Sequence, residues 1–374
     1  MDQSITLKDI KKNNYSLIYH LLYQKGKLSK QEIANELNLS LPTVSQNLVR
    51  LEKKKLIEKS GYFESTVGRR ATAYEISSRA KISIGVEILK NSVLILAIDL
   101  RGESFHQTEL DLQYLNDERY FKEVSQAIQR FIVSLDLSEE QVLGIGFAVQ
   151  GLTSIDGQKI TYGKILNSSG LEIDVFTKYL DYPCMFVHDA QGAALKELWM
   201  NNHIGDTIYL SIGPHLGGAI ILNNKLYMGN EGYSGTVEHM TVNPNGPPCY
   251  CGKNGCMETY SSIHALLEEN ESLDDFFNQV RSNIPFYRER WNTFLDNLAY
   301  SINNIRLVLN QDFILGGHLA PYLEKEDLDI LHEKVNERTA FPSNRSFIHL
   351  SHSPKHAVPI GAAIQYIQAF LNTI

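Results

Sequence analysis

The chain has 374 residues, of which 43% are apolar and 21% are charged, a composition ordinary for a soluble globular protein. This composition excludes a disordered or collagen-like chain, and the length suggests two or three domains of about 150 residues each. The longest apolar run, near Ser92–Leu100, is far shorter than the ~18 residues of a membrane span. Because Met1–Asn14 is polar and contains no apolar leader, we expect a cytoplasmic protein without membrane insertion.

The charge is distributed unevenly along the chain. Residues 1–80 carry a formal charge of +6 and the remaining residues carry −14, within a total of −8. A basic segment joined to an acidic body is typical of a nucleic-acid-binding module fused to a sensor or an enzyme. A chance asymmetry of surface charge is the alternative, and the residue pattern of the basic segment has to decide between them.

The basic segment begins with the pattern of a helix-turn-helix. Apolar residues recur at helical spacing until Gly26, which ends the first helix. Ser29 and Glu32 form a capping box at the start of a second, short helix. A third helix begins near Pro42, a residue suited to a first helical turn, and ends near Lys55. Two short helices, a tight turn and a third amphipathic helix indicate a DNA-binding unit.

The third helix carries the side chains expected of a recognition helix. Val44, Leu48 and Leu51 are expected to face inward. The outward face then carries short hydrogen-bonding groups and one guanidinium, the types that read base edges: Thr43, Ser45, Gln46, Asn47 and Arg50. Lys53–Lys55 follow and suit contacts to DNA phosphates. A solvated surface helix is the alternative, but such a helix usually mixes both charges, and Glu52 is the only acid nearby.

A wing follows the third helix. Leu56–Lys59 and Ala73–Ile76 are predicted strands separated by a polar, glycine-containing loop. Arg69 and Arg70 lie near the tip of this loop, where guanidinium groups can enter a narrow minor groove. We therefore expect a winged helix-turn-helix over residues 1–80, a fold that usually binds DNA as a dimer.

The acidic remainder contains two similar halves. Ile82–Glu87 and Val93–Asp99 are predicted to form a strand pair, and Thr207–Ile212 and Gly217–Leu222 form a second one. Each pair heads a segment that continues with helices and further strands. Mixed elements in two similar halves indicate an α/β body with two lobes and a cleft between them.

A cluster of cysteines predicts a metal site in the second half. Three of the four cysteines lie within eight residues, shortly after His239: Cys249, Cys251 and Cys256. Three thiolates and one imidazole complete the tetrahedral shell of a structural Zn²⁺ and leave no open position for catalysis. Disulfide pairing would leave an odd thiol and disagrees with a cytoplasmic protein. We interpret the remaining cysteine, Cys184, as an ordinary packing residue.

The segments Glu231–Met240, Pro244–Cys251 and Gly255–Glu258 resemble the signature of the ROK family of repressors, open reading frames and sugar kinases. In length the chain is similar to the repressor branch of that family, which includes xylose and N-acetylglucosamine repressors. The resemblance implies a winged helix at 1–80 and an actin/hexokinase-like (ribonuclease H-like) body. Its first lobe would span 81–200 and its second lobe 201–374, with a last helix that can return to the first lobe.

The resemblance also implies a sugar site between the lobes. Family kinases bind sugar hydroxyls through an Asn-Asp pair whose Asp is the base, and this pair is His188-Asp189 here. Asp189 is then a vestigial base position that can accept hydrogen bonds from a sugar, or only a cap for the helix that follows. The other matching positions are Asn167, His239 and Glu258. The family's glutamate three residues before the histidine is replaced by Thr236, and a glutamate stands two residues later.

The nucleotide side departs further from the family pattern. The glycine-rich first phosphate loop of the kinases is replaced by Glu87–Lys90 and Asn91, whose β-carbons would obstruct a phosphate. In the second loop Pro214 removes a backbone donor. Because a kinase must hold the γ-phosphate and magnesium in place, these changes predict a protein without phosphoryl-transfer activity.

The sequence therefore predicts a DNA-binding repressor of carbohydrate genes, a homodimer or dimer of dimers on operator DNA. A sugar or sugar phosphate between the lobes would release it. Two alternatives remain open from sequence: an active ATP-dependent sugar kinase with an accessory DNA-binding domain, and a repressor controlled by a protein partner. An activator would have the same sequence features.

Overall fold

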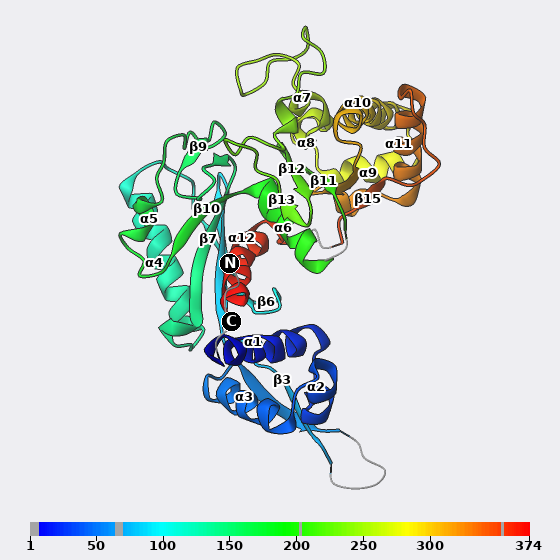
Figure 1. Cartoon of the computed structure of the whole chain (residues 1–374). Helices are drawn as coiled ribbons and strands as arrows, with labels where there is room; N and C mark the ends of the chain where they lie inside the picture. Colours follow the sequence, from blue (N-terminus) through cyan, green and yellow to red (C-terminus); the bar gives the residue numbers. More distant parts are fainter. Residues whose placement is uncertain (1–6, 64–69, 202–203, 353–354) are drawn as a thin grey trace.

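The computed structural model describes residues 7–63, 70–201, 204–352 and 355–374, with side chains from residue 13 onward. The chain forms an N-terminal winged-helix domain and a body of two lobes (Figure 1). The predicted fold class, an α/β protein with these two parts, is confirmed.

The winged-helix domain has three helices and a three-stranded antiparallel sheet with the strand order β1-β3-β2. Ser29 caps α2 by accepting a hydrogen bond from the Glu32 amide, and the Glu32 carboxylate accepts one from the Ser29 amide. Ser40 caps α3 in front of Pro42. These local signals place the helix-turn-helix where the sequence predicts it. The elements are α1 (Leu7–Lys25), β1 (Leu28–Ser29), α2 (Lys30–Leu37), α3 (Leu41–Lys53), β2 (Ile57–Tyr62) and β3 (Thr72–Ile76).

The first lobe contains a five-stranded sheet with the order β10-β7-β4-β5-β6. Strand β7 runs parallel to β4 and β10, and the β4-β5-β6 meander is antiparallel. The elements are β4 (Ile82–Ile88), β5 (Ser92–Asp99), β6 (Ser104–Asp111), α4 (Glu118–Ser134), η1 (Glu139–Gln141), β7 (Val142–Val149), β8 (Leu152–Thr153), β9 (Ile160–Tyr162), α5 (Asp174–Thr177), β10 (Cys184–His188) and α6 (Asp189–Met200).

The second lobe repeats this sheet with the order β15-β14-β11-β12-β13. It again has an antiparallel meander, β11-β12-β13, followed by two parallel strands. The two similar halves predicted from the sequence are therefore present as two sheets of one topology. The elements are β11 (Thr207–Ile212), β12 (Leu216–Leu222), β13 (Lys225–Leu226), η2 (Val237–His239), α7 (Glu258–Ser261), α8 (Ile263–Leu266), α9 (Leu273–Arg281), α10 (Pro285–Leu309), β14 (Asp312–Gly316), η3 (Ala320–Tyr322), α11 (Lys325–Arg338) and β15 (Ile348–Leu350).

The last helix, α12 (Ala357–Thr373), packs on the first lobe, so the range 201–374 does not form one lobe. It crosses β4, β5 and β7 and lies along α6 (Figure 1). Glycines let the backbones touch: a β-carbon at Gly146 would lie 2.3 Å from the carbonyl oxygen of Ala362. A β-carbon at Gly361 would lie 1.7 Å from the carbonyl oxygen of Gly192 on α6.

Helix α12 also joins the body to the winged-helix domain. Ile364, Ile367 and Leu371 of α12 are buried in one apolar cluster with Ile18 and Leu22 of α1. Apolar residues of β5 complete this cluster, so helix, sheet and DNA-binding domain share one core. Within the part of the chain that the structure describes, no helix is both long and apolar enough to cross a lipid bilayer.

We predict that Gly146→Ala destabilises the protein by about 1–3 kcal/mol, because the added methyl group overlaps the α12 backbone and rigid packing cannot absorb it. Urea unfolding measures the change. Gly205→Ala is the control, since its methyl group meets nothing within 4 Å and only the positive φ of 72° is strained. Equal stability of the Gly146→Ala variant and the unmodified protein would contradict the close packing.

Candidate functional site

The outward face of α3 carries several of the residues predicted to read DNA. Val44, Leu48 and Leu51 are fully buried, as the sequence predicts, and fix the orientation of the helix. The side chains of Gln46 and Arg50 are exposed. Thr43 and Ser45 are partly exposed, and the Thr43 hydroxyl lies 2.8 Å from the Ser40 hydroxyl at the helix cap.

The expectation that Asn47 faces outward is wrong. Its side chain is only 5% exposed, and its amide nitrogen donates a hydrogen bond to the Thr43 carbonyl one turn earlier. Asn47 lies three residues after Val44 and four before Leu51, so it borders the buried stripe of the helix and is turned toward the core. Val49, which the sequence analysis missed, is 60% exposed in line with Gln46 and adds an apolar contact suited to a thymine methyl group.

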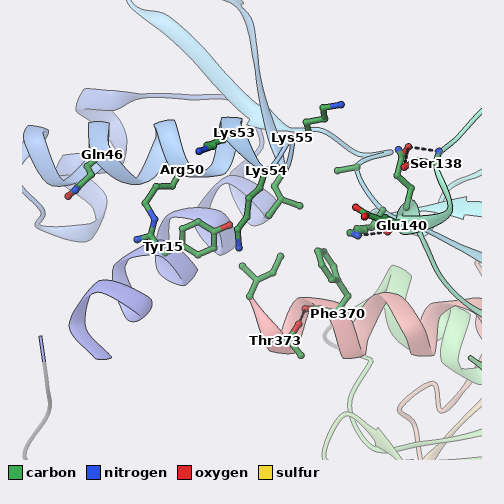
Figure 2. A pocket seen from close by; sticks show the side chains of 15 residues that line it. Tyr15, Gln46, Arg50, Lys53, Lys54, Lys55, Ser138, Glu140, Phe370 and Thr373 are labelled. Carbon is green, nitrogen blue, oxygen red and sulfur yellow. Dashed lines mark hydrogen bonds between the residues drawn. The ribbon is translucent and has the colours of Figure 1, made fainter. Parts of the chain in front are cut away.

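The predicted arginines differ in position. Arg50 lies over the ring of Tyr15 on α1, with 5.1 Å between the guanidinium carbon and the ring centroid (Figure 2). Arg70 is exposed just before β3, at the base of the wing. Arg69 lies outside the described residues. Arg50 is therefore held at the flank of α3 and not on its outermost line.

A second candidate site lies between the lobes. The side chains that line it come from both lobes: Gln150, Leu152, Tyr162, Lys164, Ile165, His188, Asp189, His215, Leu216, Glu238, His239 and Tyr250, together with Gly151. Its free volume is about 30 Å³, far below the ~300 Å³ at which ligand pockets begin. The lobes are nearly closed on each other, and a sugar can enter only if they separate.

Hydrogen bonds inside this cleft already engage two of the predicted sugar ligands. The Asp189 carboxylate accepts from the Ala190 amide at 2.7 Å and lies 3.1 Å from Nε2 of His188. The Glu258 carboxylate accepts from the Leu216 amide and contacts Nδ1 of His215, both at 2.7 Å. His215 belongs to the altered phosphate loop. Its ring therefore contacts the Glu258 carboxylate, which the resemblance assigns to sugar binding.

Two buried polar atoms in the cleft have no hydrogen-bond partner among the described residues. They are Nδ1 of His188 and Oε2 of Glu238. Burial, followed by the nearby carboxylates of Asp189 and Glu258, raises the pKa of Glu238 well above its usual range. Burial lowers the pKa of His188, so a neutral imidazole faces the cleft. Unpaired buried donors and acceptors are costly, and hydroxyl groups of a ligand can satisfy them.

Asn167 is not part of this cleft. It is exposed in a loop, has a φ of 50°, and its carbonyl accepts a hydrogen bond from the side-chain amide of Asn116. Thr236 also stays outside, because its hydroxyl donates to the Tyr233 carbonyl. Glu238 lines the cleft, whereas Thr236, at the position of the family's glutamate, does not. Lys164 and Tyr250 also line the cleft, and the sequence analysis missed both.

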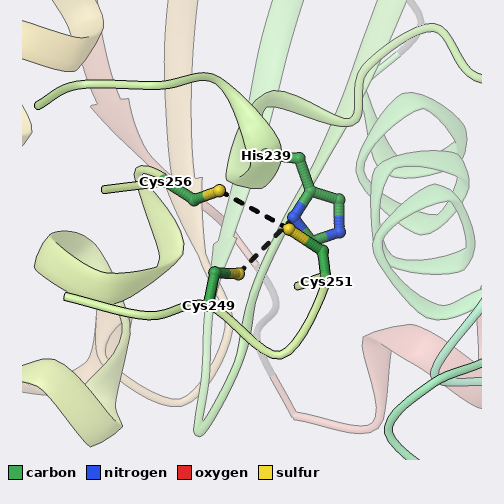
Figure 3. Close-up of side chains that lie close together, drawn as sticks. All are labelled: His239, Cys249, Cys251 and Cys256. Carbon is green, nitrogen blue, oxygen red and sulfur yellow. Dashed lines mark hydrogen bonds between the residues drawn. The ribbon is translucent and has the colours of Figure 1, made fainter. Parts of the chain in front are cut away.

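The predicted metal ligands lie together beside the cleft (Figure 3). One ligand atom from each of His239, Cys249, Cys251 and Cys256 lies within 4.8 Å of the other three. The Cys249 sulfur is 3.8 Å from Nδ1 of His239, and the sulfurs of Cys251 and Cys256 are 3.6 Å apart. Zinc–sulfur bonds of ~2.3 Å give a tetrahedron with edges of about 3.8 Å, so this donor set fits the ion.

Comparisons with known proteins identify the family of the chain and its DNA-binding domain. The ROK family model matches residues 83–368, which is more than half of the chain. The chain belongs to the ROK family. A winged helix-turn-helix DNA-binding model matches residues 16–58, which include α2 and α3.

Named relatives cover most of the chain. The xylose repressor of Bacillus spizizenii is 27% identical over 98% of this chain and 97% of its own length. The dual regulator NagC of Escherichia coli K12 is 26% identical over 74% of this chain and 68% of its own length.

Two solved structures share the fold. A ROK family transcriptional regulator, described as a homologue of the E. coli MLC protein, has a TM-score of 0.77 and 20% identity, with 97% of both chains covered. A ROK glucokinase from Streptomyces griseus, in complex with glucose and AMPPNP, has a TM-score of 0.66 and 19% identity, and matches 77% of this chain and 99% of its own.

Two amides in the loops at the family's phosphate-binding positions already have partners within this ROK protein. In the turn after β4 the Leu89 amide donates to the Ser92 carbonyl. In the second loop the Gly213 amide donates to the His215 carbonyl, and Pro214 has no amide hydrogen. These three positions therefore offer no amide to a phosphate.

Glu87, near the end of β4 at the start of the altered first loop, leads to a prediction about pH dependence. Burial, then the carboxylates of Asp189 and Glu109, raises its pKa to about 7 from the usual 4.5. Between pH 4.5 and about 7 the folded state keeps the proton on Glu87, whereas the unfolded chain releases it. The stabilisation from this proton is therefore complete below pH 4.5 and is lost as the pH rises through about 7. We predict that, with rising pH, the free energy of unfolding of the Glu87→Gln variant falls by up to about 3 kcal/mol less than that of the unmodified protein.

Urea unfolding at pH 5 and pH 8 checks this prediction. The free energy of unfolding of the unmodified protein should fall more over this interval than that of the Glu87→Gln variant. Glu231→Gln, at an exposed carboxylate, should leave the pH dependence unchanged. Parallel pH profiles of the Glu87→Gln variant and the unmodified protein would show that Glu87 does not titrate in this range.

Proposed function

We propose that this ROK protein is a transcriptional repressor of carbohydrate genes that binds operator DNA and releases it when a sugar or sugar phosphate enters the interlobe cleft. The observation that carries the proposal is the combination of an exposed reading face on α3 with unpaired buried polar atoms in a nearly closed cleft. The names of its relatives, a xylose repressor and NagC, support the carbohydrate class.

We assign the contacts with DNA bases to residues on the outward face of α3. Ser45, Gln46 and Val49 lie one helical turn apart or less and share one face, so they enter the major groove together. Thr43 and Arg50 flank this line, and Arg70, with Arg69, is assigned to the DNA backbone or minor groove at the wing. We assign Asn47 to holding the helix in place, since its amide is already used.

The effector acts by opening the lobes. A cleft of about 30 Å³ cannot hold a sugar, so binding must separate Asp189 and His188 of the first lobe from Glu238 and His215 of the second. The closed form is then the DNA-binding form. To raise the fraction of protein released from DNA from 1% to 99%, the effector must bind the open form ~10⁴-fold more tightly than the closed form. This ratio corresponds to about 5.5 kcal/mol.

Helix α12 couples the cleft to the DNA-binding domain. Asp189 begins α6, α6 packs along α12, and the far end of α12 packs against α1. Lobe opening therefore moves α6, α12 and the winged-helix domain together, as one body, relative to the second lobe. On a symmetric operator, two recognition helices must keep a spacing of whole helical turns, so we infer that a homodimer, or a dimer of dimers, loses affinity when that spacing changes.

We assign no phosphoryl transfer to this protein. The first phosphate loop has lost its glycines, Pro214 of the second loop lacks an amide donor, and the His215 ring contacts the Glu258 carboxylate. A kinase has to hold magnesium and the γ-phosphate in line with the attacking hydroxyl. The Asp189 carboxylate is then a hydrogen-bond acceptor for an effector hydroxyl and not a base.

We infer that Zn²⁺ is the ion held by His239 and the three cysteines, because thiolate and imidazole donors at tetrahedral spacing favour it. Its role is to fix the loop that carries His239, whose ring also lines the cleft. The ion would supply no chemistry of its own, since four protein ligands leave it no free position.

The experiment that tests the proposal selects duplexes from a random pool with the full-length protein. We expect a symmetric operator sequence, and fluorescence anisotropy on that operator should show release by at least one of D-xylose, N-acetylglucosamine, glucose or their phosphates. Gln46→Ala should cost ~1–3 kcal/mol of sequence preference at one base pair, and Gln31→Ala, at an exposed position of α2, should cost nothing.

Two results would overturn the proposal. One is that the pool yields no preferred sequence and no duplex binds at low salt. The other is that ATP and the same sugars give sugar phosphate in the absence of DNA, with loss of product in Asp189→Asn. Operator binding that no sugar releases would instead favour control by a protein partner.

We predict about one zinc ion per chain in purified protein, measured by elemental analysis. Cys256→Ser should lose the ion, lower the thermal unfolding midpoint and weaken the response to the effector, because a structural ion contributes directly to folding. Cys184→Ser is the matched control, since this buried thiol lies outside the cluster and contacts the Tyr182 carbonyl. A stably folded, metal-free preparation that still responds to effector would exclude the site.

A further inference from the structure

A large cavity of about 1330 Å³ lies between the winged-helix domain and the body (Figure 2). One wall is the flank of α3 together with Tyr15 of α1. The other wall is the end of α12 and the segment Ser138–Gln141 of the first lobe. Its charged lining consists of one acid, Glu140, and five cations: Arg50, Lys53, Lys54, Lys55 and Lys81.

These five cations are not neutralised within the protein. None of them forms an ion pair with a carboxylate in the described part of the chain. Arg50 and Lys54 both lie over the ring of Tyr15, at 5.1 and 5.3 Å from its centroid, and the Lys81 ammonium donates to the Glu140 carbonyl. Cations kept together in this way raise the local potential and attract an anion.

The cavity between the winged-helix domain and the body, called the cleft in this subsection, is continuous with the DNA-reading face of α3. Gln46 belongs to that face and also lines the cleft. A helix in the major groove, ~12 Å wide, lies between two phosphate backbones, so cations on its flank face one of them. Arg50, Lys53 and Lys54 stand on this flank, and Lys81 stands on the body side, before β4.

We propose, resting on the proposed operator binding, that this cleft seats the phosphate backbone flanking the operator half-site, with Lys81 as a DNA contact supplied by the body. A long, exposed polyanion fits better than a small enclosed ligand, because Arg50 and Lys53–Lys55 are all exposed to solvent. The body then touches DNA directly.

The test measures operator affinity against salt concentration for two duplexes, one that ends at the selected half-sites and one that extends ten base pairs beyond each. The unmodified protein should bind the longer duplex more tightly and with a steeper dependence on salt. Lys81→Ala should lower the slope of log K against log salt on the longer duplex by about 0.9 per chain, the value for one phosphate contact. Lys81→Arg should restore it.

Lys90→Ala is the matched control, because Lys90 is an exposed lysine of the same lobe beyond the other end of β4. Equal slopes for the Lys81→Ala and Lys90→Ala variants on the longer duplex would overturn the inference and leave the proposed function intact. Failure of the unmodified protein to bind any duplex would instead overturn the proposed function.

The competing occupant is a small phosphate compound. Calorimetry with tripolyphosphate and DNA-free protein tests it directly. Binding of tripolyphosphate that Lys81→Ala abolishes, together with an unchanged salt slope on the longer duplex, would reassign the cleft to a small anion and overturn the DNA contact. Absence of such binding, with the lower slope, supports the proposed phosphate track.

Discussion

Direct backbone contact between α12 and the first lobe is the constraint on which the rest of the molecule depends. At Gly85, Gly146 and Gly192 no side-chain layer separates the helix from the strands and from α6, and an added β-carbon would meet a backbone oxygen in each case. Close packing of this kind leaves no room for small adjustments. Helix, sheet and α6 therefore behave as one rigid body that carries the DNA-binding domain with it.

Helix α6 joins the second lobe to this rigid body through an apolar cluster with β11, β12 and β14 and through polar contacts of one carboxylate. Glu197 of α6 is buried and accepts hydrogen bonds from the Ser351 hydroxyl and from the His352 amide, in the segment that leaves β15. Its carboxylate thus ties the end of the second-lobe sheet to α6. Asp189, which lines the interlobe cleft, begins the same helix. One helix therefore connects the cleft, the junction and α12.

Local signals made much of the fold predictable. The capping box at Ser29 and the spacing of the three cysteines depend on neighbours in sequence, and the structure places both as expected. Failures occurred where tertiary contacts decide. Asn47 is polar but packs inward, and its amide donates to a carbonyl of the same helix; Asn167 is exposed and is not among the residues that line the cleft. His215 could have been suspected from its place in an altered loop, but its contact with Glu258 depends on two distant segments.

The placement of α12 also has a consequence for how the polypeptide acquires its structure. The strands that it covers begin at Ile82, more than 250 residues earlier, so these contacts close a very long loop. Such non-local pairing slows folding. Until it forms, Leu96 and Ile98 of β5, which α12 and α1 bury together, remain open to water and to other apolar surfaces. The support of the winged-helix domain by the body is therefore complete only after α12 has been synthesised and has packed against β5 and α1.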